Sequence, residues 1–452
     1  MLDDPKMKTD TDLSAQLLEI AARAGADAAD VVIVTDRSVS IGVAEGALEE
    51  AESAEGREAG LRVLIGQRQA CVSSSRLGSD ALEAMAERAV AMAREAPDDP
   101  HCGLADPALL TAPPDGAALD MVDAEPAPDA AMLEDWALSA EAAALGVKGV
   151  GQVEQAHAQT TRVDITLAAS NGFAGHYSRT TTGIGASAIA GEGLGRERDY
   201  KSEARLHRAD LPSPAAIGQT AGERAVARLG PRKPPGGAVP VLFDERVASG
   251  LVSHVLVAVN GSSVARGSSW LRDAMDAQVL PAGLSITEDP LKVRGMNSRP
   301  FDAEGIAARP QPIVEDGRLV RWVLDSATAR KLGLTTTGNA RRGTTNPPSP
   351  GTSNIALTQG RESRADLIAA MGTGLLVTSL IGASINPTTG AYSRGASGFW
   401  VEGGEIAYPV NEITIAGMLP EMMLSLRPAN DADLFRSISV PSCLVEGLTV
   451  GA

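Results

Sequence analysis

Apolar and polar positions in the first hundred residues follow two different periods in succession. Leu13, Leu17 and Ala21 recur at helical spacing and predict a helix over residues 12–24. Short apolar–polar alternations then predict antiparallel strands at residues 31–34, 38–43, 60–65 and 70–73. A second helix is predicted over residues 80–96, where Pro97 ends it.

The same order of elements recurs after a loop rich in Pro, Asp and Ala that spans residues 97–128. Helices are predicted over residues 129–145 and 215–229. Between them the pattern predicts strands at residues 151–158, 161–170, 180–190 and 200–206. Asn171-Gly172 predicts a tight hairpin turn, because both central residues of a type I′ turn need positive φ. The order suggests a structural duplication with little sequence identity; the alternative is that helix-flanked meanders are simply common.

A Pro/Gly-rich segment, residues 230–237, separates this region from a third one. There a strand is predicted over residues 240–243 and a helix over 245–259, and the rest is dense in Gly, Ser, Thr and short Val/Ile/Leu runs. The predicted class is α+β, with helix–antiparallel meander–helix units followed by a β-rich domain. The predicted domains are an N-terminal α+β domain, a central α+β domain and a C-terminal β-rich domain, at residues 1–98, 127–231 and 238–452.

Composition narrows the classes of protein that remain. The 452 residues are 44% hydrophobic and carry a formal net charge of -17, which disfavours nucleic acid and anionic membrane surfaces as partners. The three cysteines form no CxxC pair, so neither a disulfide framework nor a four-cysteine zinc site is expected. Residues 1–6 show no signal-peptide pattern, and no apolar run is long enough to span a bilayer. A soluble cytoplasmic protein is expected.

Common catalytic motifs are absent from the sequence: the chain has no GxxxxGK[ST] loop and no GxSxG elbow. No two of the five histidines are spaced to place two metal ligands on one helix face. His254 lies among Leu251, Val255 and Val259 in the predicted helix, which favours a core or interface histidine.

The densest aromatic cluster lies in a Gly-rich stretch, residues 386–410. Two strands are predicted around Gly403-Gly404, and an edge there could pair with an extended peptide through main-chain groups. The alternative is a plain hairpin whose aromatic side chains fill the core.

The same stretch carries a family resemblance. Residues 388–405 read TTGAYSRGASGFWVEGGE and residues 408–417 read YPVNEITIAG; further matching segments are PFDAEG at 300–305, DSATARKLGL at 325–334 and MGTGLLV at 371–377. Together they resemble the TldD/PmbA family over nearly the whole chain, and its PmbA branch (also called TldE) in particular. The resemblance implies that TldD-type members are zinc metallopeptidases with an HExxxH helix and a cysteine ligand. PmbA-type members lack that set and pair with a TldD-type subunit in proteolysis of unfolded polypeptides and maturation of peptides.

Carried over residue by residue, the zinc motif is degenerate in this chain. Its first histidine falls on His254, its glutamate on Val255 and its second histidine on Val259. A valine can neither activate water nor bind a metal. Cys443 lies near the C-terminus as the family's cysteine ligand does, but its surroundings match poorly. The sequence therefore predicts no catalytic residue, no metal and no cofactor in this chain, with zinc expected in the TldD-type partner.

The resulting hypothesis is a subunit of a heteromeric metallopeptidase that helps to hold an unfolded or extended peptide. The residues expected to contact peptide or partner are Tyr392, Ser393, Arg394, Gly395, Phe399 and Trp400. Two alternatives stay open: a hydrolase acting alone, for example through Ser393, and a non-catalytic protein that modulates another enzyme. Homodimer and heterodimer are not distinguished, and in isolation the chain could form a homodimer.

Overall fold

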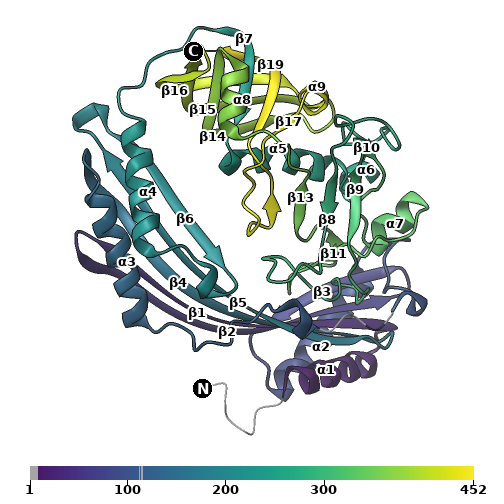
Figure 1. Cartoon of the computed structure of the whole chain (residues 1–452). Helices are drawn as coiled ribbons and strands as arrows, with labels where there is room; N and C mark the ends of the chain where they lie inside the picture. The colour runs from purple at the N-terminus through teal and green to yellow at the C-terminus, as the bar shows by residue number, and fades with distance from the viewer. Residues whose placement is uncertain (1–8, 111, 113–115, 452) are drawn as a thin grey trace.

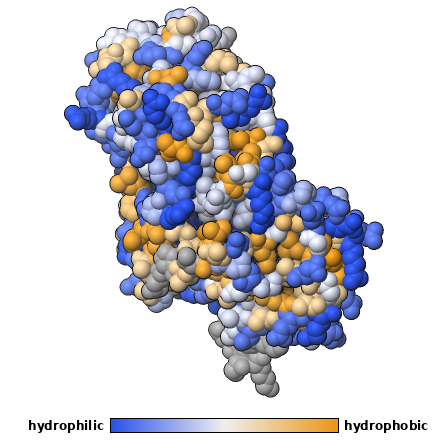
Figure 2. All heavy atoms as spheres, turned by 90° about the vertical axis from the view of Figure 1, so that its right-hand side faces the viewer, coloured by the Kyte–Doolittle hydropathy of each residue, from blue (hydrophilic) through white to orange (hydrophobic). Residues whose placement is uncertain are grey.

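The computed structural model describes residues 9–110, 112 and 116–451. Residues 1–6, for which the sequence predicts no signal peptide, lie outside this range. In Figure 1 a long curved sheet forms the lower and left part of the molecule, and the C-terminal half stands above the right-hand end of that sheet. Turned by 90°, the surface shows hydrophilic residues interspersed with smaller hydrophobic groups (Figure 2). No helix within the described ranges has the length and apolar character that a membrane span requires.

The long sheet is antiparallel and joins strands from both N-terminal units in the order β3-β2-β1-β4-β5-β6. Its strands are β1 (Ala28–Ala44), β2 (Ala47–Ile65), β3 (Arg68–Ser74), β4 (Val150–Ala169), β5 (Ala174–Ala190) and β6 (Glu197–Arg205). The central pair is β1 with β4, in register from Asp30↔Ala169 to Val43↔Ala156. The two units are thus joined edge to edge in one sheet.

Four helices cover one face of this sheet at its two ends. They are α1 (Asp10–Ala24), α2 (Ser79–Glu95), α3 (Ala130–Leu145) and α4 (Pro214–Ala227). Val31 and Ile33 of β1 pack in the core under α1 and α2, and Ile41 and Val43 pack in the core under α3 and α4. Side chains of a strand alternate between the two faces of a sheet, so these four odd-numbered positions all point to one face. Both helix pairs therefore lie on the same face of the sheet.

The C-terminal half is built around a closed sheet with the order β16-β15-β14-β7-β19-β17, in which β16 also pairs with β19. Its strands are β7 (Gly237–Phe243), β14 (Gly374–Ile385), β15 (Ala391–Glu402), β16 (Glu405–Met418), β17 (Arg427–Pro428) and β19 (Cys443–Gly451). The pairing of β16 with β19 closes the strands into a barrel, whose apolar core also takes in helix α5 (Glu245–Ala258).

Shorter elements complete this half. A small sheet contains β8 (Ile286–Glu288), β9 (Gln311–Glu315), β10 (Arg318–Leu319), β13 (Ile355–Leu357) and β18 (Ile438–Ser439), and a two-stranded ribbon contains β11 (Ala340–Arg341) and β12 (Ser349–Pro350). The remaining helices are α6 (Gly261–Ala265), α7 (Ser326–Leu332), α8 (Arg364–Met371) and α9 (Leu419–Leu424).

Several contacts hold the C-terminal half on the sheet, among them an aromatic cluster and an ion pair. On the face without helices, Phe301 packs edge-on against Phe173 and Tyr177, with ring centroids 5.0 and 5.3 Å apart. At the edge strand β6, Arg246 of α5 donates two hydrogen bonds of 2.9 Å to the Asp199 carboxylate.

The predicted α+β class, the repeated order of helix, meander and helix, and the β-rich C-terminal half are confirmed. The prediction of separate short strands at residues 31–34 and 38–43 is wrong, because β1 runs unbroken through both. The same holds for residues 151–158 and 161–170, which form β4. The three-domain division stays a prediction.

Candidate functional site

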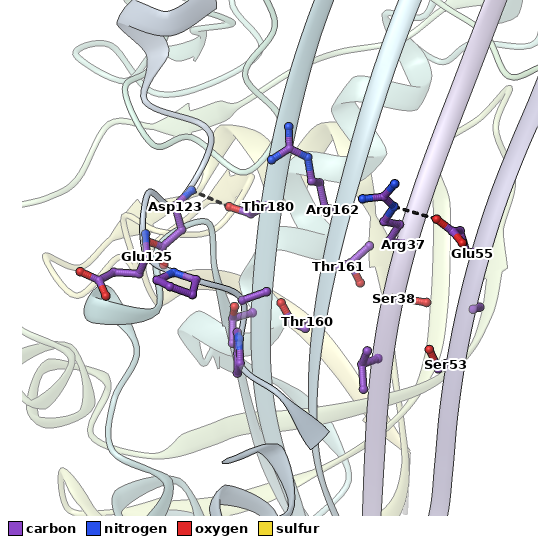
Figure 3. Close-up of a pocket in the computed structure, with 16 residues that line it drawn as sticks. Arg37, Ser38, Ser53, Glu55, Asp123, Glu125, Thr160, Thr161, Arg162 and Thr180 are labelled. Carbon is purple, nitrogen blue, oxygen red and sulfur yellow. Dashed lines mark hydrogen bonds and ion pairs between the residues drawn. The ribbon is translucent and has the colours of Figure 1, made fainter. Parts of the chain in front are cut away.

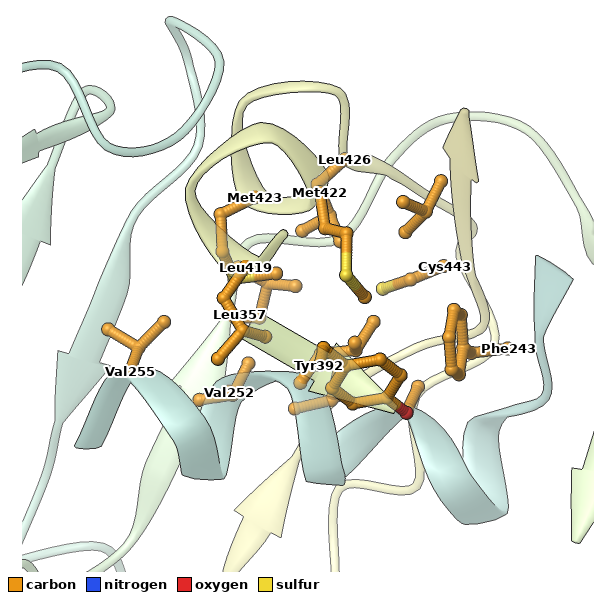
Figure 4. Close-up of a cluster of buried hydrophobic side chains, with 14 of the residues drawn as sticks. Phe243, Val252, Val255, Leu357, Tyr392, Leu419, Met422, Met423, Leu426 and Cys443 are labelled. Atoms are coloured by element: carbon orange, nitrogen blue, oxygen red, sulfur yellow. The ribbon is translucent and has the colours of Figure 1, made fainter. Parts of the chain in front are cut away.

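Helix α5 positions the three residues that correspond to the degenerate zinc motif. It begins after Asp244, whose side chain caps the Arg246 amide at 3.3 Å. Val255 is 1% exposed and Val259, the residue that follows the helix, is 0% exposed. Figure 4 shows Val252 and Val255 directed from the helix into a cluster that contains Leu357, Leu419 and Met423. This face of α5 is therefore apolar core.

His254 lies beside that face and is only partly buried. Its ring meets the Tyr392 ring edge-on, with centroids 5.7 Å apart. Burial, and after it the positive charge of Arg394, lowers the pKa of His254 below its ordinary value of 6.5. A neutral imidazole follows at neutral pH. The structure thus brings His254 together with two residues of the aromatic stretch.

Strand β15 carries all six residues predicted to contact peptide or partner, and the six differ in burial. Tyr392 and Trp400 are 3% and 2% exposed and belong to the barrel core, whereas Ser393, Arg394, Gly395 and Phe399 are partly exposed. The hairpin around Gly403-Gly404 is present, with β15 as one arm and β16 as the other.

The expected free sheet edge is not found at β15. Gly395 is in register with Ile381 of β14 on one side and with Thr414 of β16 on the other. Both edges of β15 are therefore already paired, so a peptide cannot add to this strand as predicted. The side chains of Tyr392 and Trp400 fill the core, as expected for the alternative of a plain hairpin. Contact of the other four residues with peptide or partner stays a prediction.

Two shallow hollows adjoin His254 and the start of β15. One is lined by Tyr392 and Ser393, the other by His254 and Trp270, and both include Ile385 and Pro387. Arg394 is held nearby by a 2.6 Å hydrogen bond from its Nε to the Gly382 carbonyl. His254, Ser393 and Arg394 thus lie around one partly exposed region, whereas Trp400 lies farther along β15, opposite Leu375 and Tyr408.

These residues do not fit a catalytic zinc ion. The glutamate and second-histidine positions are buried valines, and the Cys443 thiol lies in the same apolar core, where burial raises its pKa far above its ordinary value. A thiol must lose its proton to bind zinc. Among the residues that the structure describes, no group of three His, Cys, Asp or Glu side chains is placed to hold a metal. The metal content of the protein itself stays a prediction.

Another hollow of about 530 Å³, which the sequence did not indicate, lies on the helix-bearing face between the two helix pairs. Figure 3 shows its floor of Ser, Thr and Arg side chains from four strands, crossed by the segment that carries Asp123 and Glu125. Arg37 pairs with Glu55 at 2.9 Å, and the Asp123 amide donates to Thr180 at 2.7 Å. The floor contains no nucleophile with an adjacent base.

Comparison with known proteins assigns the family. Profiles of the PmbA/TldA metallopeptidase domain 1, central domain and C-terminal domain match residues 29–93, 123–229 and 236–452. The chain is 35% identical to the metalloprotease PmbA of Escherichia coli O157:H7 over 96% of this chain and 94% of that protein. A metalloprotease PmbA homolog from Haemophilus influenzae gives the same three values.

Solved structures agree. A protein from Bacteroides thetaiotaomicron, described as a modulator of DNA gyrase, has 27% identity and a TM-score of 0.90, covering 99% of this chain and 100% of that one. TldE from Thermococcus kodakarensis shares the fold, with a TM-score of 0.82 at 18% identity over 97% of this chain and 100% of that one. The chain therefore belongs to the TldD/PmbA metallopeptidase family, and the full-length PmbA matches assign it to the PmbA branch.

Proposed function

We propose that this chain is the non-metallated subunit of a heteromeric metallopeptidase of the cytoplasm. A TldD-type partner supplies the zinc ion and the general base, and this chain helps to hold an unfolded or extended peptide. Membership of a metallopeptidase family supports the proteolytic context.

The observation that carries the proposal is the apolar face of α5. A catalytic zinc helix needs a carboxylate to activate water and at least two nitrogen ligands on one side. Here the corresponding side chains, Val255 and Val259, are buried hydrocarbon in a packed core. The positions that we match to the zinc motif thus have a structural role in this chain, which supports a division of labour between two subunits.

The test is a reconstitution with a TldD-type subunit from the same organism. Cleavage of an unfolded fluorescent casein is measured for each chain alone and for the mixture, with co-purification and zinc content followed in parallel. We expect no cleavage by this chain alone, one zinc per partner subunit, and cleavage by the mixture above that of the partner alone. Cleavage by this chain alone would support the stand-alone hydrolase, and an unchanged partner activity despite complex formation would contradict the proposed subunit role.

The region around His254, Ser393 and Arg394 is the proposed contact for peptide or partner. Arg394 is the most informative residue there, because it is partly exposed and its Nε donates to the carbonyl of Gly382 in the neighbouring strand β14. Its other guanidinium N–H groups can therefore donate to a carboxylate or a peptide carbonyl. If Arg394→Ala loses peptide cleavage but still associates with the partner subunit, the region belongs to peptide binding. If the variant loses association, the region belongs to the subunit interface.

A further inference from the structure

A second cavity lies where the C-terminal half meets the helix-free face of the long sheet. It has a volume of about 300 Å³. Its floor is hydrocarbon from β1 and β4: Val32, Val34, Val163, Ile165 and Leu167. Tyr177 and Phe301 line it as well, with their ring centroids 5.3 Å apart.

The polar lining of this cavity is dominated by four arginines that are distant in the sequence, namely Arg179, Arg299, Arg341 and Arg342. Among the residues that the structure describes, Arg342 is the one of the four with an ion pair, which it forms with Asp30. Arg179 donates to the carbonyls of Met296 and Ser298 at 3.0 and 3.1 Å, and Arg299 donates to those of Ala340 and Gly351 at 2.8 and 3.3 Å. Carbonyl groups orient a guanidinium but do not neutralise its charge.

Each of the four arginines also keeps a buried nitrogen atom without a partner. Within the described part of the chain, no hydrogen-bond acceptor is found for Nε of Arg179, Arg299 and Arg341 or for Nη2 of Arg342. Arg299 is only 5% exposed. Buried polar atoms of folded proteins are nearly always paired, and an unpaired buried donor is costly. Four such atoms on the arginines that line one cavity show that hydrogen bonds within the described chain leave this guanidinium cluster incompletely satisfied.

The carboxylate that lines the cavity is not that acceptor. Both oxygens of Asp302 are engaged by backbone amides, Oδ1 by those of Glu304 and Ile306 and Oδ2 by that of Ala340, at 2.9 to 3.0 Å. Burial, together with the nearby charges of Arg299 and Arg179, lowers the pKa of Arg341 to about 10. Positive charges are thus concentrated at this cavity, although the chain as a whole has a formal net charge of -17 and acidic residues are plentiful.

We infer that this cavity is a binding site for an organic anion that combines an apolar body with one carboxylate. The site is defined by the hydrocarbon floor and by the four arginines Arg179, Arg299, Arg341 and Arg342. Guanidinium groups bind carboxylates through paired N–H donors. The hydrocarbon floor and the two aromatic rings match an apolar body. A free organic acid and the C-terminal end of a peptide with an apolar last residue present this same chemistry.

The test uses the full chain and titration calorimetry with defined probes. 4-Phenylbutyrate supplies the apolar acid, 4-phenylbutanol has the same body without charge, and inorganic phosphate is an anion without the body. N-Acetyl-Gly-Gly-Phe, with a free carboxyl group, represents the peptide source. The variant is Arg341→Gln, and the matched control is Arg361→Gln at an exposed arginine outside the cavity.

We expect 4-phenylbutyrate to bind at least tenfold more tightly than either 4-phenylbutanol or phosphate, with Arg341→Gln weakening it tenfold or more and Arg361→Gln leaving it unchanged. Tighter binding of the acetylated peptide would identify a peptide end as the source, and weaker binding a free acid. Without ligand, Arg341→Gln is expected to melt at or above the temperature of the parent, because it removes a positive charge that burial and the charges of Arg299 and Arg179 disfavour. A lower melting temperature for ligand-free Arg341→Gln, equal binding of acid and alcohol, or acid binding that survives Arg341→Gln would each overturn the assignment.

Discussion

Replacing Val255 with glutamate tests the structural role of the degenerate zinc motif directly. Val255 is 1% exposed and packs in the barrel core, so the substitution removes about 2 kcal/mol of apolar burial. Holding the buried carboxyl protonated at pH 7 adds roughly 3 kcal/mol, since each unit of pKa displacement is worth about 1.4 kcal/mol. The expected total of about 5 kcal/mol corresponds to a loss of roughly 10–20 °C in the melting temperature of this half.

The pH dependence of Val255→Glu has a definite sign. Burial raises the pKa of a carboxyl above its value in the unfolded chain, about 4.3. The unfolded state then loses its proton first as the pH rises, so the deficit in unfolding free energy grows between pH 4 and pH 7. The variant is therefore expected to lie much closer to the parent at pH 4 than at pH 7.

Thermal and urea denaturation at both pH values measure this deficit. The matched control is Val257→Glu, which lies on the same helix at a side chain that is 56% exposed and should change stability by no more than about 0.5 kcal/mol. If Val255→Glu and Val257→Glu unfold alike, the valine face of α5 is solvated, and the argument for a filled core at the motif positions fails.

Three further predictions concern metal, Arg394 and the contact between the two halves. Purified chain should carry no stoichiometric zinc by elemental analysis; one zinc per chain that is lost in His254→Ala would contradict this. Arg394→Ala should retain the parental melting temperature while lowering peptide cleavage by the mixed complex, whereas Tyr392→Ala should lose about 3 kcal/mol of stability, because its side chain is 3% exposed in the core. Burial alone would raise the pKa of Asp199, but the hydrogen bonds and charge of Arg246 outweigh burial and lower that pKa. The ion pair therefore stabilises the fold above about pH 4, and its contribution is lost as the pH falls through the lowered pKa of Asp199. Arg246→Ala should therefore raise the midpoint of acid unfolding relative to Arg246→Lys, and equal midpoints would show that the pair contributes nothing.

The errors in strand prediction have a common physical cause. Thr35, Asp36 and Arg37 interrupt the apolar alternation of β1 and suggest a break, yet the strand continues through them. This part of the sheet lies between the two helix pairs, where Arg37 borders the hollow of Figure 3 and needs no apolar partner. Polar residues in this stretch indicate that no helix packs on the strand there; they do not indicate that the strand is interrupted. The first half of β2 was overlooked for the same reason, since residues 47–53 are exposed.

The sequence was more informative about identity than about sites. Long contiguous motifs carried the family resemblance, and the apolar neighbours of His254 favoured a core or interface position for this part of the helix, where Val255 and Val259 are buried. The placement of β15 between two strands was predicted only in part: the hairpin around Gly403-Gly404 pairs it with β16, but no strand was predicted for its other partner, β14. The arginine cavity left no local signal at all: its arginines come from β5, from the loop before Phe301, from β11 and from the residue after β11, and only the fold brings them together.

The junction between β1 and β4 has a consequence for how the chain reaches its native state. Asp30 is paired with Ala169, so the two central strands of the sheet meet only after a long stretch of intervening chain has been made. Such distant pairings form slowly, because loop closure must precede any gain from the contact. Until β4 arrives, the full length of β1 is an open strand edge, a known template for aggregation. A fragment that stops at residue 98 keeps that edge permanently and should self-associate, whereas one that extends through β6 should remain monomeric at the same concentration.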